Sequence, residues 1–470
     1  MRRNIKASNP TYTYKMSLIT DSTGAVITET DSITTMFSYL SSNPLTANST
    51  LRFNTSDNYV ITTTLTLNNN TAYTLTIRNI KGFNPSIDGN NTLDTLLSTT
   101  NGKLVFDGVI FKKALVQASD IGQTIVRING GANARYITFK NCIFSHGYCG
   151  IRGTDGIRDL TVQDCKFYQV SNCSLRIGNG ANPFPDLQDV IIERCFFRDD
   201  LNEAVIPNGD GILKYQPLLL VKGCQNIRIS NCIFKQTQEN NIAIETSDTV
   251  IVENITTTDC GIAAPAAEMI QISNSNIVTV RNCYIYPDAN FTNNSLGITY
   301  SSNIRIYYCS ILSNPNTASQ GGLSLFRSKT VLEIAGNIIN EGIYYPVNND
   351  AAYVGTLATD YVSEHDNVIL ISDDFAGLID ISNLNIADIR VQIQFQTSFA
   401  TYQSTYSRGG NSVSGRSTGL LISGVRDTGD VFLLSPSSVG YKLVPSQIST
   451  ITTDLSGKTR TYPTSPGAFH

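Results

Sequence analysis

A nine-residue motif with a cysteine near its end recurs along most of this 470-residue chain. Asn303–Ile311, Asn226–Phe234 and Tyr136–Phe144 are clear copies. Aligned on the cysteine slot, the copies follow one another at intervals of 23 to 37 residues. A self-similar period of this size is typical of a stacked array of repeats. The slot holds Ile80, Val109, Cys142, Cys165, Cys195, Cys232, Ile255, Cys283, Cys309 and Asn337.

Each copy alternates apolar and polar residues, which predicts a β-strand. A second short strand precedes it in most repeats, as at 242–244 and 296–299, and small polar residues join the two. A longer, variable loop completes the period, and no room remains for a helix of ten or more residues. We therefore predict an all-β chain whose main part is a parallel β-helix of about ten coils, each paired with the next.

The cysteines are expected to fill an inward-facing stack as free thiols, because a small apolar side chain suits such a slot. Metal ligation is disfavoured, because no Cys-x-x-Cys pair occurs and the spacing is that of a coil. A disulfide framework is disfavoured as well, because a chain of this length can bury a large core. Asn141, Asn231 and Asn282, one residue before the slot, are expected to stack along the rod. We predict no metal and no cofactor.

Composition restricts the partners. Only 15% of the residues are charged, the net charge is −4 and no basic run occurs, which argues against nucleic acid as a partner. The basic start at 1–6 leads into no apolar stretch, so neither a signal peptide nor membrane insertion is expected. A β-helix with this polar surface is expected on the outside of a cell or a virion, yet no export signal is seen. This combination favours a virion component that is made in a host cytoplasm and released by lysis.

Residues 31–40 are the best helix candidate, because four apolar side chains between Ile33 and Leu40 fall on one face and Asp31 or Ser32 can cap the start. A Thr-Leu-Arg-Phe strand at 50–53 and the strands of 58–67 follow. This entry resembles that of pectate-lyase-like right-handed parallel β-helix proteins, in the form used by bacteriophage tailspikes and fibres. The resemblance extends over 29–345. It implies a right-handed helix, an N-terminal helical cap and a homotrimer.

After Asn337 the repeat fades, and a new all-β pattern starts near 367 that loosely resembles the small C-terminal β-sandwich domains of phage fibres. A polar loop is expected at 404–419. The predicted organisation is an N-terminal attachment segment (1–28), a helix and strand cap (29–67), the parallel β-helix (68–345), a connector (346–366) and a C-terminal β-rich trimerisation or tip domain (367–470).

The interval from Cys195 to Cys232 is the widest, at 37 residues, and indicates an inserted loop. Loops of adjacent coils align on one side of a rod, so we expect an acidic groove there. Hydrolysis of a glycan needs two carboxyl groups, whereas a lyase needs a basic residue such as Lys214, Arg198 or His146. Candidate catalytic residues are Asp199, Asp200, Glu203, Asp210 and Glu239. Candidate glycan-binding residues are Arg198, Lys214, Tyr215, Phe184, Gln236 and His146.

Two observations weigh against catalysis. Asp199-Asp200 is not followed by the Gly-His-Gly of polygalacturonases, and the loop charges can equally be solvated turn residues. The favoured hypothesis is a trimeric phage spike, fibre or decoration protein that binds host-surface glycan and contacts other virion proteins through its N-terminal segment. A tailspike depolymerase is the first alternative and a bacterial surface adhesin the second.

Overall fold

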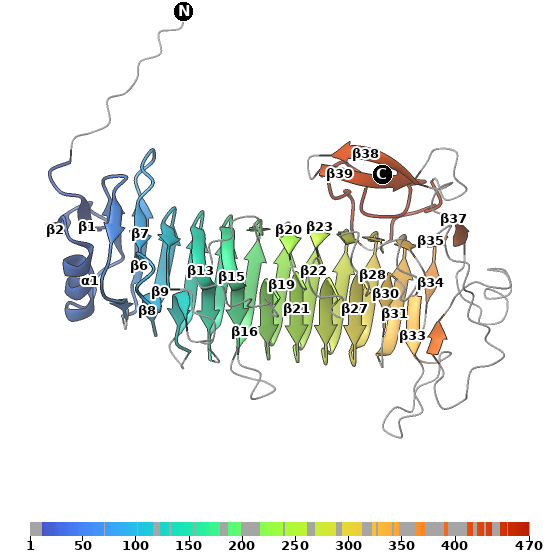
Figure 1. Ribbon diagram of the computed structural model, residues 1–470, viewed down its shortest axis with the longest axis horizontal. Coiled ribbons are helices and arrows are strands. Elements are labelled where there is room, and N and C mark those ends of the chain that lie inside the picture. The colour runs from blue at the N-terminus through green and yellow to red at the C-terminus, as the bar shows by residue number, and fades with distance from the viewer. Residues whose placement is uncertain are drawn as a thin grey trace, which may run out of the picture.

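The computed structural model describes residues 12–69, 71–100, 102–115, 123–130, 134–154, 156–178, 187–198, 217–237, 240–260, 268–287, 294–312, 322–325, 328–340, 343–346, 363–371, 390–392, 411–416, 421–426, 429–434, 442–448 and 450–469. Strands lie side by side along the long axis of the molecule, and the short helix is at the N-terminal end (Figure 1). The arrangement confirms a mostly β chain built of parallel, β-helix-like sheets.

One sheet has fourteen strands, all parallel from β3 onward, with β1 and β2 added antiparallel at the N-terminal end. The order is β2 (Val26–Thr30), β1 (Met16–Thr20), β3 (Ser49–Phe53), β6 (Thr74–Asn79), β9 (Lys103–Asp107), β12 (Arg135–Lys140), β14 (Arg158–Gln163), β16 (Gln188–Glu193), β19 (Asn226–Ser230), β22 (Thr249–Glu253), β25 (Ile277–Arg281), β28 (Ser302–Tyr307), β31 (Lys329–Ala335) and β34 (Glu364–His365).

The second sheet has 23 strands in two ladders, joined because β13 (Ile143–Gly153) and β15 (Lys166–Ile177) run through both. The first ladder adds β4 (Asn58–Val60), β7 (Ser86–Asp88), β10 (Ile110–Lys112), β17 (Phe196–Arg198), β20 (Ile233–Thr237), β23 (Thr256–Cys260), β26 (Tyr284–Pro287), β29 (Ser310–Ile311), β32 (Ile338–Asn340), β35 (Val368–Ile371) and β37 (Val413–Arg416). The second adds β5 (Leu65–Leu67), β8 (Thr95–Thr99), β11 (Thr124–Ile128), β18 (Leu219–Lys222), β21 (Ile242–Glu245), β24 (Ile270–Ser273), β27 (Leu296–Thr299), β30 (Leu323–Ser324), β33 (Ile343–Pro346) and β36 (Arg390–Gln392).

A coil therefore has three strands, one more than the repeat pattern predicted. The nine-residue motif is not a single strand, because the residue before the slot has a positive φ in successive coils. Asn141, Asn231, Asn282 and Tyr308 have φ values of 53°, 55°, 54° and 51°. This left-handed residue turns the chain from one sheet to the other, and asparagine adopts that conformation at lower cost than most residues.

The slot itself is an inward stack, as expected. Its six cysteines are buried free thiols, and the Cys142 thiol lies 3.5 Å from the carbonyl oxygen of Phe106 in the preceding coil. The last slot residue, Asn337, is also fully buried, and its Oδ1 accepts a 2.7 Å hydrogen bond from the backbone N–H of Cys309. Ile80 departs from the pattern because it is only half-buried.

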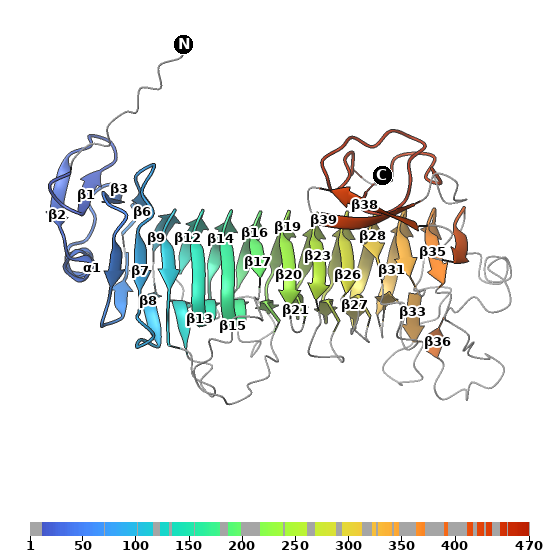
Figure 2. The same cartoon turned by 45° about the horizontal axis from the view of Figure 1, so that its top comes forward.

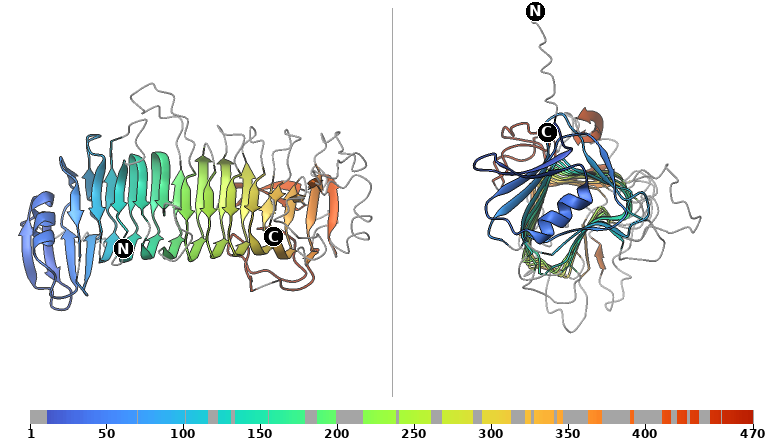
Figure 3. Two further views of the ribbon diagram at one scale, coloured as in Figure 1. Left: turned by 90° about the horizontal axis from the view of Figure 1, so that it is seen from below. Right: turned by 90° about the vertical axis from the view of Figure 1, so that its left-hand side faces the viewer.

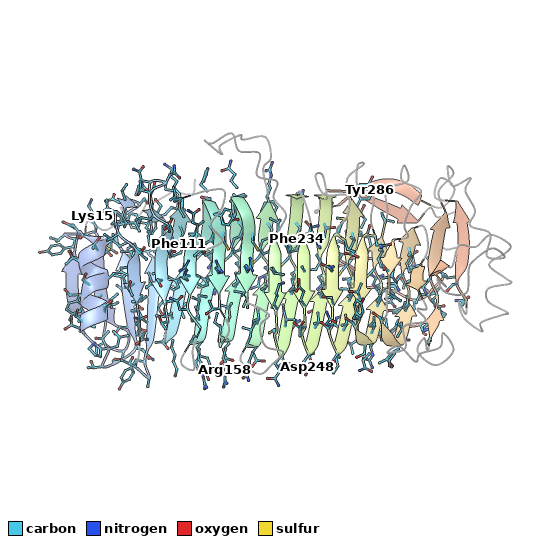
Figure 4. All side chains as sticks on the ribbon, turned by 60° about the horizontal axis from the view of Figure 1, so that its bottom comes forward. Lys15, Phe111, Arg158, Phe234, Asp248 and Tyr286 are labelled. Atoms are coloured by element: carbon cyan, nitrogen blue, oxygen red, sulfur yellow. The ribbon has the colours of Figure 1, made fainter. Side chains whose placement is uncertain are left out.

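Five phenylalanines stack behind the slot, with ring centroids 4.6 to 5.4 Å apart. Phe111 begins this stack and Phe234 ends it, and both lie within the rod (Figure 4). The spacing follows from the distance between paired strands, so identical side chains repeat their contacts from coil to coil. The core is thus one continuous apolar column.

At the N-terminal end, α1 (Ile33–Ser42) forms where it was predicted, and the Ser32 side chain accepts a hydrogen bond from the Thr35 N–H. Its four apolar residues join the main core cluster. The helix lies in front of the coils in the end-on view of Figure 3. Strands β1 and β2 begin inside the segment 1–28, which was predicted to serve only for attachment, and they extend the fourteen-stranded sheet.

At the C-terminal end, parallel pairing does not stop at residue 345. Strands β34 and β35 pair in parallel with β31 and β32, and β37 pairs with β35 although it lies in the predicted loop 404–419. The hairpin of β38 (Leu421–Arg426) and β39 (Gly429–Leu434) lies beside the rod rather than beyond its end (Figure 2). No β-sandwich is formed by the described residues after 367.

Residues 442–469, the C-terminal strap, pack against the outside of the coils. The Gly467 N–H donates to the Gly336 carbonyl at 2.7 Å, and the Ala468 N–H donates to Ser310 Oγ at 3.0 Å. Buried Arg460 reaches Asn282 Oδ1 at 3.0 Å, and its guanidinium carbon lies 4.1 Å from the centre of the Tyr308 ring. The strap therefore binds to the outer surface of several successive coils.

Candidate functional site

Most of the predicted groove falls outside the described residues. This holds for Asp199, Asp200, Glu203, Asp210, Glu239, Phe184, Lys214 and Tyr215. Gln236 belongs to β20, but its side chain is also outside the described part. His146 and Arg198 are described, so the site is built from the strands on both sides of the widest interval.

Arg198 ends β17 and belongs to an outward row on the first ladder. Tyr168, Arg198 and Lys235 are in register on β15, β17 and β20, and they point away from the core because Phe167, Phe197 and Phe234 point into it. The Phe196 ring lies 5.7 Å from that of Tyr168. We call Tyr168, Phe196, Arg198 and Lys235 the aromatic–basic row.

A second outward row lies on the second ladder. Arg127, Arg152 and Arg176 are in register on β11, β13 and β15, between inward residues such as Ile151 and Leu175. We call these three residues the arginine row. The same row continues through Leu220 and Ala243, which are 3% and 2% exposed. The face thus changes from long cationic side chains to small apolar ones along the rod.

A bend in β13 and β15 separates the two rows. His146 occupies it with a φ of 56° and an exposed side chain. A small cluster of Tyr148, Cys149, Cys173, Leu220 and Ala243 is buried next to it. A hydrogen bond with the Cys173 thiol lowers the pKa of Cys149, and the charges of Arg152 and Arg176 act in the same direction. The arginine row therefore places its positive charge close to the bend.

Glu268 is a candidate that the sequence pattern missed. It lies just before β24, on the side of the coil where the long loops occur, and burial raises the pKa of its carboxyl group. A Cβ atom at Gly297 would lie 2.5 Å from Glu268 Cγ, so the side chain lies over the glycine of the next coil. Nothing in its local sequence marks it, and Gly297, which is in register with Gln271 three residues further along the chain, does not indicate it either.

A second titratable cluster lies at the other end of the rod. His365 contacts Glu333 Oε1 at 3.0 Å and Asp366 Oδ2 at 2.8 Å, and Tyr307 donates to Glu333 Oε2 at 2.7 Å. Burial opposes protonation of the imidazole, but its hydrogen bonds to the two carboxylates outweigh this and the net pKa of His365 is raised. The imidazole fills the space between the carboxylates, so this cluster joins coils instead of leaving room for a substrate.

No group of three His, Cys, Asp or Glu side chains in the described part of the chain is placed to hold a metal ion. Within the same residues, no helix has the length and apolar character needed to cross a membrane.

Comparison with known proteins agrees with the fold. Residues 217–356 match the family described as "Right handed beta helix region". A search of curated proteins gave no match. Among solved structures, tailspike protein 3 of bacteriophage CBA120 is similar, with 10% identity and a TM-score of 0.37 over 71% of this chain and 53% of that one.

The catalytic domain of a GH87 alpha-1,3-glucanase, solved with tetrasaccharides, is also similar, with 10% identity and a TM-score of 0.28 over 67% of this chain and 58% of that one. In both cases the match spans little more than half of the other protein. The predicted parallel β-helix is confirmed by the sheet topology, and residues 217–356 of this chain match the model of the right-handed β-helix region.

Proposed function

We propose that this protein is a virion component of a bacteriophage, a β-helical spike, fibre or decoration protein that attaches to glycan on the host surface. The observation that carries the proposal is the pair of outward rows, aromatic–basic and arginine, on strands in register beside the widest interval between coils. A rod with such rows offers a long, shallow surface rather than a deep pocket, which suits a polymer.

The chemistry of the aromatic–basic row fits a sugar chain. The rings of Tyr168 and Phe196 offer apolar faces, and Arg198 and Lys235 supply charged donors one coil apart. Aromatic rings pack against the apolar faces of sugar rings, while guanidinium and ammonium groups donate to hydroxyl or carboxylate oxygens. The four side chains together form one binding strip along the rod.

A glycan array probed with the full chain tests the proposal. We expect binding to at least one bacterial surface glycan, reduced about tenfold by Tyr168→Ala because an aromatic contact is lost. Tyr136→Ala is the matched control, because Tyr136 is 51% exposed but lies on the fourteen-stranded sheet. An array without binding, or equal losses in both variants, would refute glycan attachment through this strip.

We further propose that the protein acts as a homotrimer joined to other virion proteins through its N-terminal segment. The resemblance to phage spikes supports this, as do the outward Ile191 and Ile277 of the fourteen-stranded sheet, which are 40% and 41% exposed. Sedimentation should give a trimer that Ile191→Lys weakens. A monomer at micromolar concentration would contradict the assembly but would leave glycan binding untouched.

One observation favours glycan cleavage as a second candidate function. Glu268 is a partly buried carboxyl group with a raised pKa on the loop-bearing side, as a general acid requires. Hydrolysis also needs a second carboxylate about 5–10 Å away. Mass spectrometry of a bound glycan after long incubation distinguishes the candidates. Shortened products that disappear with Glu268→Gln favour the enzyme, and an intact glycan favours attachment alone.

A further inference from the structure

The fourteen-stranded sheet ends in a strand whose outer edge pairs with no described strand. This strand is β2, which takes the first place in the strand order and pairs with β1 alone among the described residues. It lies at the left-hand end of the rod in Figure 2. The outer edge of such a strand carries backbone N–H and C=O groups without sheet partners, and another extended chain can pair with them.

The hydrogen bonds of β1 show which residue of β2 faces outward. The Asn54 N–H donates to the Lys15 carbonyl oxygen at one end of the β1–β3 ladder, so every second residue from Lys15 onward bonds to β3, and the residues between them bond to β2. Thr28 and Thr30 pair with residues of that second set, so their backbone groups face β1. Glu29 lies between them and therefore turns its N–H and C=O groups away from β1.

The surface around this edge is apolar and acidic. Val26 and Ile27 of β2 are 57% and 42% exposed. Ten large apolar residues are exposed in the described part of the chain, and six of them lie within residues 12–73. Two cations and four carboxylates lie within residues 12–60, so the net charge there is −2. Exposed apolar side chains that gather at one end of a molecule indicate a contact with another protein.

Two features disfavour a second copy of this chain as the partner. A bulge leaves Ile27 without a register partner on β1, and bulges and charged side chains at an edge prevent identical edges from pairing. Glu29 keeps its negative charge, because its contact at 2.8 Å is the neutral hydroxyl group of Ser17. A second copy would bring its own acidic end to this edge, whereas a strand with Lys or Arg residues would be attracted to it.

We propose that β2 accepts a strand of another virion protein, and that this strand alternates basic residues with β-branched apolar ones. The inference rests on the proposed attachment to other virion proteins and names how the partner is held. Backbone hydrogen bonds to Glu29 hold the added strand, and β-branched residues favour the extended conformation that it needs. The attraction between its basic side chains and the acidic end of the rod selects the partner.

Synthetic peptides titrated into the full chain test the inference. The probe is an end-capped peptide of alternating Lys and Val, and its counterpart of alternating Glu and Val reverses the charge. A third peptide repeats the basic sequence with two consecutive N-methylated residues, whose N–H groups would otherwise serve the two opposite edges of the strand. We expect the basic peptide to bind, and the other two to bind at least tenfold more weakly. The preference for the basic peptide should fall as salt rises.

Variants of β2 locate the binding. Glu29→Lys brings the net charge of residues 12–60 to zero and should abolish the preference for the basic peptide. Asp159→Lys makes the same change of charge on β14, in the middle of the same sheet, and should alter binding less than twofold. Glu29→Pro removes the outward N–H group at a position where a sheet edge tolerates proline, and it should weaken the basic peptide at least tenfold.

The outcomes separate this inference from the proposed function. Equal binding of the basic and the N-methylated peptide would reduce the effect to charge attraction and overturn strand addition. No peptide binding, or equal losses in Glu29→Lys and Asp159→Lys, would overturn it as well. Glycan binding on the array is unaffected by these results, and its absence beside peptide binding overturns glycan attachment alone. Circular dichroism identifies variants that fail to fold. Glu29→Gln, which should lower the preference to about threefold, replaces such a variant.

Discussion

Two columns of polar side chains run along this rod with the same strand-to-strand geometry but opposite chemistry. In the asparagine column, Asn254 Nδ2 donates to Asn231 Oδ1 at 3.1 Å, and Asn282 Nδ2 donates to Asn254 Oδ1 at 2.7 Å. Arg460 of the strap then donates to Asn282 Oδ1 and ends the column. In the arginine row, three cations that cannot accept a hydrogen bond from one another repeat at the same spacing.

The difference shows what stacking does to a polar group. An amide is both donor and acceptor, so repeating it builds a chain of hydrogen bonds that stabilises the coils. A guanidinium only donates, so repeating it builds no such chain and adds repulsion between like charges. The asparagine column is thus explained by the fold alone, whereas the arginine row belongs to the surface that we propose binds glycan.

The largest effect is expected where the asparagine column meets the strap. Arg460→Ala removes the guanidinium donor from Asn282 Oδ1 and from the carbonyl oxygen of Gly467, both in buried surroundings, whereas the carbonyl oxygen of Ala468 keeps the Leu455 N–H. We expect the local stability of the strap to fall by about 3 kcal/mol. Hydrogen exchange of residues 442–469 measures it. Lys458→Ala, an exposed cation in the same segment, should have little effect, and equal protection in both variants would contradict the role of Arg460.

The middle of the column gives the next largest effect. Asn254→Ala removes both side-chain hydrogen bonds and places alanine at a φ of 54°, for a combined cost of about 2–3 kcal/mol. Asn254→Gly keeps the left-handed turn and removes only the side chain, so the difference between the two variants isolates the backbone cost. Thermal unfolding of both variants and of the parent protein measures their relative stability. If glycine were as stable as asparagine, the column would have no stabilising role.

Charged groups also stabilise coils where their signs alternate, as in the Glu333–His365–Asp366 cluster. Because the folded-state pKa of His365 is raised above 6.5, its contribution is complete below that pH and is lost as the pH rises through the folded value. We therefore expect strands β34 and β35 to be less protected at pH 8.5 than at pH 6. His365→Gln should abolish this difference, and an unchanged difference in that variant would assign it to other groups.

The smallest effect, of opposite sign, is expected in the arginine row. Arg176→Gln removes one of the repelling charges, so stability in low salt should stay the same or rise by about 0.2–1 kcal/mol. Added salt should erase the gain, because it screens the repulsion in the parent protein. Melting curves at two ionic strengths measure this. Destabilisation as large as that of Asn254→Ala would mean that the row is structural.

The sequence predicted the fold well because the rod repeats itself. The cysteine slot, the strand alternation and α1 could be read from local patterns, and Cys142, Cys232 and Cys309 are buried as those patterns require. The third strand of each coil was missed because a single left-handed residue, such as Tyr308, divides what looks like one alternating run. The residues after 345 were assigned to another domain because β34, β35 and β37 are too short to carry a visible repeat.

The candidate site was less predictable. The site at the widest interval stays a prediction, because the predicted acidic residues lie outside the described residues, and the flanking strands carry cations. Arg127, Arg152 and Arg176 are 25 and 24 residues apart, and their alignment appears only once the register is known. Glu268 is found only in the structure, because its side chain lies over Gly297 of the next coil. Which residues of successive coils lie opposite one another depends on the lengths of the loops, and no local sequence pattern encodes those lengths.

The most direct test compares binding and stability in one protein, the variant in which Arg127, Arg152 and Arg176 are all replaced by glutamine. Calorimetric titration with the glycan that binds the parent protein most tightly is paired with a melting curve of the same sample. The account predicts that binding is lost while the melting temperature stays within about 2 °C of the parent value. Retained binding, or a melting temperature as low as that of Asn254→Ala, would contradict the distinction between a structural column and a binding row.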